Sequence, residues 1–400
     1  MIASFTPCVL HGKIDAPPSK SMAHRYLIGA ALSGKKCVLN GISFSEDILA
    51  SIDCIRALGA KITVDGDSVT VDPQGFMQAE APILNCRESG STLRFFIPLA
   101  LCLGRSVRFT GSERLLERPL GVYEELCRDN GFVFEKNEGL ITVCGSLKSG
   151  SYKIRGDISS QFITGLILAL VYLSEDSSIE IIPPFESRSY IDLTLSALSF
   201  FGACVRFVDE YRIEIKKSQM QAFSGRIEGD YSNAAFLDAF NFLGSDVEVG
   251  NLKLDSLQGD RVYSEYFEKL SSGTPTLDIS NCPDLGPILF ALAALKNGAV
   301  FTGTDRLKVK ESDRGSAMHE ELSKLGGGLI FGENKITVPK QELRYNGTEL
   351  CGHNDHRIVM ALSVILSKIG GDINGAEAVK KSYPEFFEDI KKLFAEVELI

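Results

Sequence analysis

The sequence lacks any apolar run long enough to cross a lipid bilayer. Its longest uncharged apolar stretch, residues 162–173, has 12 residues and contains Thr164 and Gly165, whereas a membrane-spanning helix needs about 20. The N-terminus also lacks the basic and then apolar pattern of a secretory signal peptide. We therefore expect a protein of the cytoplasm with no membrane partner.

Closely spaced cysteines are lacking as well. The chain has 10 cysteines in 400 residues but no Cys-x-x-Cys motif, which argues against a disulfide framework and against a zinc site. Its five histidines show no metal-ligand spacing either. His24 and His356 lie near expected helix openings and are candidates for lining a ligand site. His11, His319 and His353 are interpreted as ordinary surface or capping residues, and we predict no metal.

An excess of positive charge is the third feature that the sequence lacks. Its 42 Lys and Arg residues are outnumbered by 52 Asp and Glu residues, for a formal net charge of −10, which argues against a nucleic-acid partner. An anionic ligand would therefore need a local cluster of cations. The composition, with 44% hydrophobic and 24% charged residues, is that of a globular protein, and the length predicts two domains.

A repeated unit runs along the chain. Each copy begins with a short polar segment and continues with an Ala- and Leu-rich helix, a short strand and often a second, amphipathic helix. Six copies predict a pseudo-symmetric α/β fold with three repeats in each of two domains. The alternative is that such helices are simply common in α/β proteins. The apolar helices are expected to open near Ser21, Gly90, Ser160, Ser232, Gly286 and Asp355.

Turn-forming residues suggest where the domains divide. Pro17-Pro18 and Ser224-Gly225 are the candidate hinges. We expect the first domain to span residues 13–227 and the second to combine residues 1–12 with residues 228–400. The chain would then cross between the domains twice.

Several cations lie at the expected helix openings. Helix N-termini carry unpaired N–H groups and a partial positive charge, so they attract phosphate and carboxylate groups and disfavour cations. Lys20, Arg25 and Arg357 nevertheless lie there, and an anionic ligand would explain their placement. An isolated Lys or Arg is usually a solvated surface charge, and the 310–314 segment could form an ion-pair ladder. The same polar pattern at several equivalent positions favours a site for a small polyanion between the domains.

Seven short motifs follow one another along the chain. They are PSKS (18–21) with Arg25, SGSTLR (89–94), ERP (117–119), SSQF (159–162), VKESDR (309–314), NDHR (354–357) and KSYP (381–384). In this order, and over essentially the whole chain, they resemble the 5-enolpyruvylshikimate-3-phosphate (EPSP) synthase family. The resemblance implies a two-domain inverse α/β barrel of six pseudo-repeats, three per domain, which closes on its substrates.

The resemblance also implies a reaction. The enolpyruvyl group of phosphoenolpyruvate would pass to the 5-hydroxyl of shikimate 3-phosphate, with release of phosphate through a tetrahedral intermediate, in the shikimate pathway of aromatic amino acid biosynthesis. A monomer with neither metal nor organic cofactor is implied. Adding an alcohol across an enol double bond needs one proton removed from oxygen and one delivered to carbon, which two carboxyl groups with different pKa values can do. The phosphates and the carboxylate of the substrates require many cations.

Individual residues are assigned by the resemblance alone. Asp284 is implied as the proton acceptor for the hydroxyl, Glu311 as the proton donor to the methylene carbon, and Lys20 as a catalytic group that reaches both substrates. The implied contacts to shikimate 3-phosphate are Lys20, Ser21, Arg25, Ser159, Ser160, Gln161, Ser187, Asp284 and Lys310. Those to phosphoenolpyruvate are Lys20, Gly90, Arg118, Gln161, Arg314, Arg357 and Lys381.

Some positions depart from the family pattern. Arg306 and Leu307 stand where many members have Asn and an aromatic residue, and Glu88 stands where Asn is frequent, which leaves one contact to each substrate open. The related UDP-N-acetylglucosamine enolpyruvyl transferases carry a reactive loop cysteine, whereas residues 112–119 contain none. A catalytically silent binding protein would lack Lys20, Asp284 or Glu311, and all three are present.

Overall fold

The computed structural model describes residues 1–137, 139–173 and 175–400. These residues divide into two compact units, which we call the central unit (Pro18–Glu228) and the terminal unit (Met1–Pro17 with Gly229–Ile400). The chain therefore passes between the units twice. Within the described ranges, no helix combines the length and the hydropathy that a membrane span requires.

Three apolar helices form the core of the central unit. They are α1 (Lys20–Leu32), α3 (Gly90–Leu101) and α6 (Ser160–Leu173), and nearly all of their residues are buried. Both α1 and α3 pack against α6. Ser19 and Ser89 cap α1 and α3, because each side chain accepts a hydrogen bond from a backbone N–H of the first turn. The other helices are α2 (Glu46–Ala57), α4 (Glu113–Glu117), α5 (Gly121–Asp129) and α7 (Arg188–Phe200).

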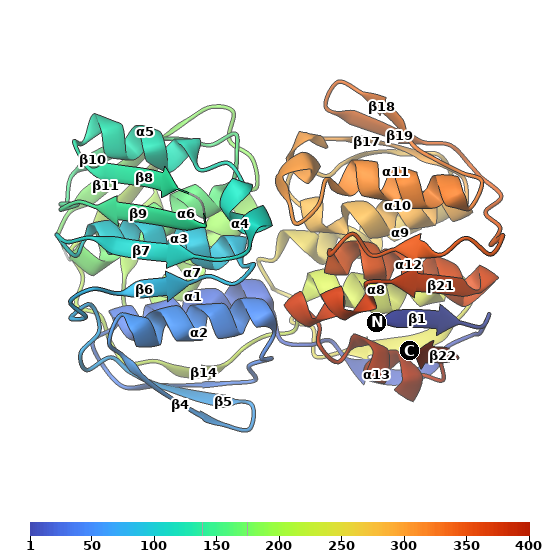
Figure 1. Ribbon diagram of the computed structural model, residues 1–400, viewed down its shortest axis with the longest axis horizontal. Coiled ribbons are helices and arrows are strands. Elements are labelled where there is room, and N and C mark those ends of the chain that lie inside the picture. Colours follow the sequence, from blue (N-terminus) through green and yellow to red (C-terminus); the bar gives the residue numbers. More distant parts are fainter. Residues whose placement is uncertain (138, 174) are drawn as a thin grey trace. The chain divides into compact units, whose positions relative to one another are not determined.

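Three four-stranded sheets of the central unit share one pairing pattern, a parallel pair followed by two antiparallel pairs. One of them, the sheet of β6 to β9, covers α3, which contacts its strands β7 and β9 (Figure 1). The strand orders are β14 (Ser224–Arg226)–β3 (Cys37–Asn40)–β5 (Ser68–Asp72)–β4 (Lys61–Asp65), β6 (Ile83–Asn85)–β7 (Val107–Thr110)–β9 (Leu140–Cys144)–β8 (Val133–Asn137), and β10 (Ser151–Arg155)–β11 (Ser177–Ile182)–β13 (Arg212–Lys216)–β12 (Cys204–Phe207).

The terminal unit also has a core of three buried helices. These are α8 (Tyr231–Phe242), α10 (Gly286–Leu295) and α12 (His356–Ile369), and each packs against the other two. The remaining helices are α9 (Tyr263–Ser272), α11 (Arg314–Lys324), α13 (Phe386–Lys392) and the short 3₁₀ helices η1 (Gly259–Val262), η2 (Pro283–Leu285), η3 (Asp305–Val309) and η4 (Ala376–Lys381).

Two four-stranded sheets of the terminal unit repeat the same pairing pattern. In one of them β1, from the start of the chain, lies between β21 and β22, from its end. Every described sheet is open, with two edge strands. The orders are β16 (Thr276–Asp278)–β17 (Ala299–Thr302)–β19 (Lys335–Val338)–β18 (Ile330–Gly332) and β20 (Leu350–Cys351)–β21 (Gly371–Asn374)–β1 (Ile2–Phe5)–β22 (Val397–Leu399), beside the parallel pair β15 (Asp246–Gly250)–β2 (His11–Asp15).

The six predicted apolar helices are confirmed, since each begins within one residue of its expected opening. The hinge predicted at Ser224-Gly225 is wrong. Both residues lie in β14, which pairs in parallel with β3, and this pairing holds the backbone in the sheet of the central unit. The crossing follows Glu228.

The first crossing also differs from the expected position after residue 12. Strand β2 continues to Asp15, and its whole length pairs with β15 of the terminal unit. The segment as far as Pro17 therefore lies with the terminal unit.

Candidate active site

The predicted site residues divide between the two units. The central unit carries Lys20, Ser21, Arg25, Gly90, Arg118, Ser159, Ser160, Gln161 and Ser187, and the terminal unit carries Asp284, Lys310, Glu311, Arg314, Arg357 and Lys381. We call these two groups the central half-site and the terminal half-site.

Lys20 is the first residue of α1 and lies mostly out of solvent. Its Nζ forms an ion pair with Asp47 Oδ2 at 2.9 Å, and the two side chains are only 15% and 9% exposed. Asp47 lies in the first turn of α2. The carboxylate compensates for a cation at a helix N-terminus, where the partial positive charge of the helix is unfavourable to it.

Arg25 is a buried cation whose acceptors are all uncharged. Its Nε donates to Thr194 Oγ1 at 2.8 Å, its Nη1 to the Ser21 carbonyl at 2.7 Å and its Nη2 to the Tyr190 carbonyl at 2.9 Å. Burial lowers the pKa of Arg25 to about 10, so the group stays positive at neutral pH. Among the described residues no carboxylate forms an ion pair with it. A desolvated guanidinium without a counter-ion favours the binding of an anion.

Gly90 and Arg118 lie against each other at the N-terminus of α3. A Cβ atom added at Gly90 would lie 2.4 Å from Arg118 Nη1 and 3.2 Å from Arg94 Nη1. Arg118 follows α4 and is 7% exposed. The glycine is therefore what lets the guanidinium groups approach the first turn of α3.

Gln161 is held by two partners from α3. Its Oε1 accepts a hydrogen bond from Arg94 Nη1 at 2.7 Å, and its Nε2 donates to Ser91 Oγ at 2.8 Å. These bonds tie the first turn of α6 to the first turn of α3. The neighbouring Ser159 and Ser160 are buried at the start of α6, and Ser187 is completely buried at the start of α7.

Asp284 of η2 is the acidic centre of the terminal half-site. Its Oδ1 contacts Lys310 Nζ at 3.1 Å and Arg314 Nη1 at 2.7 Å, and its Oδ2 lies 3.9 Å from Arg357 Nη2. Burial raises the pKa of Asp284, but the three cations outweigh burial and hold the pKa well below its usual range. The carboxylate is therefore ionised when no ligand is bound.

Arg314, the first residue of α11, binds three carboxylates at once. Beside Asp284, its Nη2 donates to Glu311 Oε2 at 2.8 Å and its Nε to Asp355 Oδ2 at 2.9 Å. The guanidinium is only 1% exposed. One arginine thus fixes both carboxyl groups that the sequence resemblance assigns to proton transfer.

Arg357 and Lys381 complete the terminal half-site. Arg357 lies in the first turn of α12 and donates from Nη1 to Asn233 Oδ1 at 2.9 Å. Lys381, at the end of η4, donates to the Asn354 carbonyl at 2.6 Å. Both side chains are nearly buried, so their positions depend on these protein acceptors.

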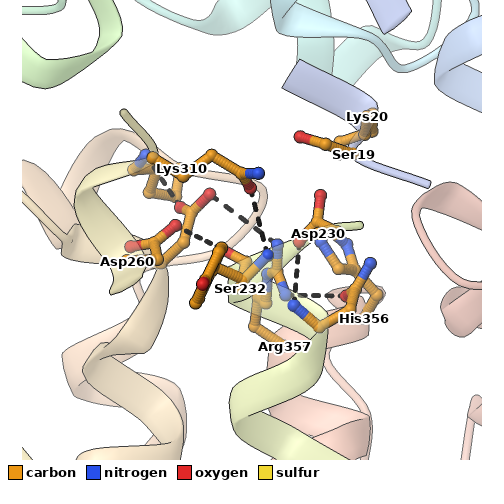
Figure 2. Close-up of polar contacts among 12 residues, drawn as sticks. Ser19, Lys20, Asp230, Ser232, Asp260, Lys310, His356 and Arg357 are labelled. Atoms are coloured by element: carbon orange, nitrogen blue, oxygen red, sulfur yellow. Dashed lines mark hydrogen bonds and ion pairs between the residues drawn. The ribbon is translucent and has the colours of Figure 1, made fainter. Parts of the chain in front are cut away.

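Asp260 is a buried carboxyl that sequence analysis did not single out. It lies in η1, and the hydroxyl of Ser232 donates to its Oδ2 (Figure 2). Burial raises the pKa of Asp260 to about 7; Asp284 and Asp230 add to the rise, and Ser232 and Arg357 oppose it. The carboxyl therefore holds a proton well above the pH at which an exposed Asp loses it.

Four partners of the predicted residues were missed. Arg94 lies inside the SGSTLR motif, and Asn233 follows the predicted opening at Ser232, so both could have been found. Asp47 and Asp260 carry no such signal, because acidic residues are common near helix starts and their role depends on a distant partner. Of the two histidines considered, His24 is buried beside Ser51 Oγ, at 2.8 Å from its Nδ1, and burial followed by nearby Lys20 and Arg25 lowers its pKa well below the usual range.

Comparison with known proteins points to one family. A model of EPSP synthase (3-phosphoshikimate 1-carboxyvinyltransferase) matches residues 6–390. The 3-phosphoshikimate 1-carboxyvinyltransferase of Clostridium kluyveri is 39% identical over 417 residues, which cover 99% of this chain and 98% of that relative. The enzyme of the same name from Clostridium perfringens is 37% identical, with 97% of each chain covered.

Solved structures give the same fold. The EPSP synthase from Acinetobacter baumannii superposes with a TM-score of 0.79 at 22% identity, and the alignment covers 100% of both chains. The likeness therefore extends over both the central and the terminal unit.

Proposed function

The chain belongs to the EPSP synthase family. On this premise we propose that the central and terminal half-sites bind phosphoenolpyruvate and shikimate 3-phosphate. The protein is an enzyme that transfers the enolpyruvyl group of phosphoenolpyruvate to shikimate 3-phosphate in the biosynthesis of aromatic amino acids. The 37–39% identity to enzymes of this name over nearly their full length supports the assignment.

Shikimate 3-phosphate binds chiefly through the central half-site. Arg25 supports this placement, because its neutral acceptors leave the positive charge to be balanced by a ligand. The other contacts proposed for this substrate are Lys20, Ser21, Ser159, Ser160, Gln161, Ser187, Asp284 and Lys310.

Phosphoenolpyruvate takes its cations from both half-sites. Arg118 beside Gly90 offers a planar fork that suits an oxyanion, as do Arg314 and Arg357. The contacts proposed for this substrate are Lys20, Gly90, Arg118, Gln161, Arg314, Arg357 and Lys381.

Asp284 acts as the base in the addition step. Three cations depress the pKa of Asp284, so with these partners alone it is a weak base. When substrate oxyanions share those cations, the pKa of Asp284 rises towards its usual range and the carboxylate can take the proton of the 5-hydroxyl. The hydroxyl oxygen then forms its bond to C2 of phosphoenolpyruvate.

Glu311, which must hold a proton when the substrates are bound, delivers that proton to the methylene carbon. The observation that carries this assignment is that one guanidinium, Arg314, holds Asp284 and Glu311 at 2.7 and 2.8 Å. Arg314 thereby fixes the base and the acid relative to each other. Both proton transfers can then be aligned with the same bound substrates. A proton of the new methyl group then returns to Glu311 as the bond between C2 and the phosphate oxygen breaks. The phosphate leaves with the proton that Asp284 took from the hydroxyl.

The finer architecture is proposed on the same premise. The pairing pattern shared by five sheets supports an inverse α/β barrel with three repeats in each unit. From the family resemblance we also propose that the protein is a monomer, that it works in the cytoplasm, and that it needs neither a metal nor an organic cofactor.

A phosphate-release assay tests the proposed function. Purified protein should release phosphate from phosphoenolpyruvate only when shikimate 3-phosphate is also present. UDP-N-acetylglucosamine should not replace shikimate 3-phosphate as the acceptor. Release with the nucleotide sugar, or none with either acceptor, would overturn the assignment.

A further inference from the structure

We propose that Glu321 and His353, which lie outside both half-sites, position the segment of residues 351–355 that completes the terminal half-site. The proposal rests on the proposed function, since it concerns the phosphoenolpyruvate contacts. Both are positioning residues: they act through the segment and not on the substrate.

Glu321 is a completely buried carboxylate on α11, seven residues after Arg314. Its Oε1 accepts a hydrogen bond from His353 Nε2 at 2.6 Å, and its Oε2 accepts one from the backbone N–H of Cys351 at 2.9 Å. Lys324 Nζ lies 2.8 and 3.0 Å from the two oxygens. Burial raises the pKa of Glu321, but these three donors outweigh burial and lower it, so the carboxylate stays ionised and keeps accepting.

The segment held by Glu321 has an unusual backbone. His353 and Asn354 both adopt the left-handed region, with φ of 49° and 50°, which costs free energy for residues other than glycine. Two such residues in a row need contacts that hold them. The side chain of His353 supplies one of these contacts, because it anchors its own backbone to α11.

The far end of the segment carries the terminal half-site. The Asn354 carbonyl accepts the hydrogen bond from Lys381 Nζ at 2.6 Å. Asp355 accepts from Arg314 Nε at 2.9 Å and caps α12 by accepting from the backbone N–H of Arg357 at 2.9 Å. A shift of the segment would therefore displace all three cations proposed to bind phosphoenolpyruvate from the terminal unit.

A metal does not explain the cluster. Oxygen and nitrogen atoms of Glu320, Glu321 and His353 lie within 4.8 Å of one another. The ammonium group of Lys324, however, contacts both Glu321 oxygens and lies 3.5 Å from Glu320 Oε1. The chain itself thus supplies the cation. His353, interpreted from the sequence as an ordinary surface or capping residue, is 20% exposed in the structure and is bonded through Nε2 to the buried Glu321.

The test replaces His353 by Asn and by Gln. Asn tolerates the left-handed backbone but is too short to reach Glu321, so His353→Asn should raise the KM for phosphoenolpyruvate roughly tenfold, as expected for losing a hydrogen bond to a charged group. The KM for shikimate 3-phosphate should change less than about twofold. The kcat should also fall, because Arg314 holds the two carboxyl groups proposed for proton transfer. His353→Gln keeps the length and an N–H donor, so it should restore most of the loss.

Glu320→Gln is the matched control. This substitution removes a carboxylate charge of the same cluster, one residue away from Glu321. The Glu320 side chain is 59% exposed and makes no hydrogen bond to residues 351–355 among the described contacts. Its kinetics should equal those of the wild type. The wild-type phosphate-release assay tests the function separately from the variants.

Two outcomes would overturn the positioning role. One is an unchanged KM for phosphoenolpyruvate in His353→Asn, and the other is an equal loss in all kinetic parameters with no rescue by Gln. If His353→Asn does not fold, hydrogen exchange in the wild type decides. Exchange at residues 351–355 should slow when phosphoenolpyruvate is added, and no change would reject the proposal.

Discussion

Buried charges in the two half-sites differ in how they are balanced. Arg25 of the central half-site donates only to uncharged oxygens, whereas Lys310 and Arg314 of the terminal half-site share Asp284. An anion can therefore bind Arg25 without displacing a carboxylate. At Arg314 a substrate oxyanion must compete with protein carboxylates, which makes the protonation of those groups part of binding.

Gly90→Ala tests the approach of Arg118 to helix α3. Because the new Cβ would lie 2.4 Å from Arg118 Nη1, the guanidinium must move, and this flexible end of the side chain can do so with little cost to the fold. We expect phosphoenolpyruvate to bind roughly tenfold more weakly, or about 1.4 kcal/mol, with a change in unfolding free energy below about 1 kcal/mol. Calorimetry and urea unfolding measure the two quantities.

Gly121→Ala is the control for this substitution. Gly121 begins α5, and a Cβ added there meets nothing within 4 Å. Substrate affinity should stay at the wild-type value. Equal affinities for the two variants would remove Arg118 from the phosphoenolpyruvate site.

Asp260→Asn tests the raised pKa of the buried carboxyl. Between about pH 4 and pH 7 the folded protein keeps this proton while the unfolded chain loses it, because the pKa in the folded state is about 7. Stability from this group therefore falls as the pH rises through that window. The amide of the variant does not titrate and can still accept the hydrogen bond from Ser232.

We expect the difference in unfolding free energy between Asp260→Asn and the wild type to grow with pH. Relative to the wild type, Asp260→Asn should gain on the order of 2–3 kcal/mol of unfolding free energy between pH 5 and pH 8. Denaturant unfolding at both pH values measures it. Parallel pH profiles for the two proteins would show that Asp260 is ionised in the folded state.

An aspartate caps the N-terminus of both α11 and α12, but the two aspartates have different further roles. Asp313 caps α11 by accepting from the backbone N–H of Ser316 at 3.2 Å, and Asp355 caps α12 in the same way. Asp355 is completely buried and also pairs with Arg314, whereas Asp313 is half-buried. Asp313 thus caps α11, whereas Asp355 both caps α12 and compensates the charge of Arg314.

Replacing each aspartate by asparagine separates the two roles. Asn caps a helix about as well as Asp, so Asp313→Asn should change the unfolding free energy by less than about 0.5 kcal/mol. Asp355→Asn should cost about 3 kcal/mol, because it breaks a buried ion pair and leaves Arg314 with less compensation. Urea unfolding of the two variants measures the contrast, and equal effects would contradict it.

Elements were more predictable than the contacts between them. Periodic apolar residues after a Ser, Asp or Gly opening located the buried helices, because both signals are local. The Ser224-Gly225 hinge failed because its pairing with Val38 and Leu39 is not visible in local sequence. Likewise, the motifs located Lys20 but not its partner Asp47, which lies 27 residues away along the chain.

Whole-molecule behaviour follows from the division of the site residues. The proposed contacts to each substrate come from both units, which two chain crossings connect. If the proposed contacts hold, we expect binding of both substrates to favour conformations in which both half-sites reach them. Closure of this kind would exclude water from the reacting groups and strengthen their electrostatic interactions.

Solution scattering tests this closure. The radius of gyration should decrease when shikimate 3-phosphate is present together with an unreactive phosphoenolpyruvate analogue, and it should decrease less with either ligand alone. Arg25→Gln protein, which should lose shikimate 3-phosphate, serves as the control. With both ligands present, its radius should decrease no more than that of the wild type with the phosphoenolpyruvate analogue alone. An unchanged radius with both ligands bound would contradict the closure.

The position of β1 between β21 and β22 has a consequence for synthesis on the ribosome. Synthesis of the central unit is complete once Glu228 has been added. This unit can therefore fold while residues 229–400 are still being made. Strand β1 is made before the central unit and must wait for Asn374 and then Leu399 before both of its edges are paired. The residues of β22 thus act as a latch, and a chain that stopped before Val397 would leave β1 with an open edge.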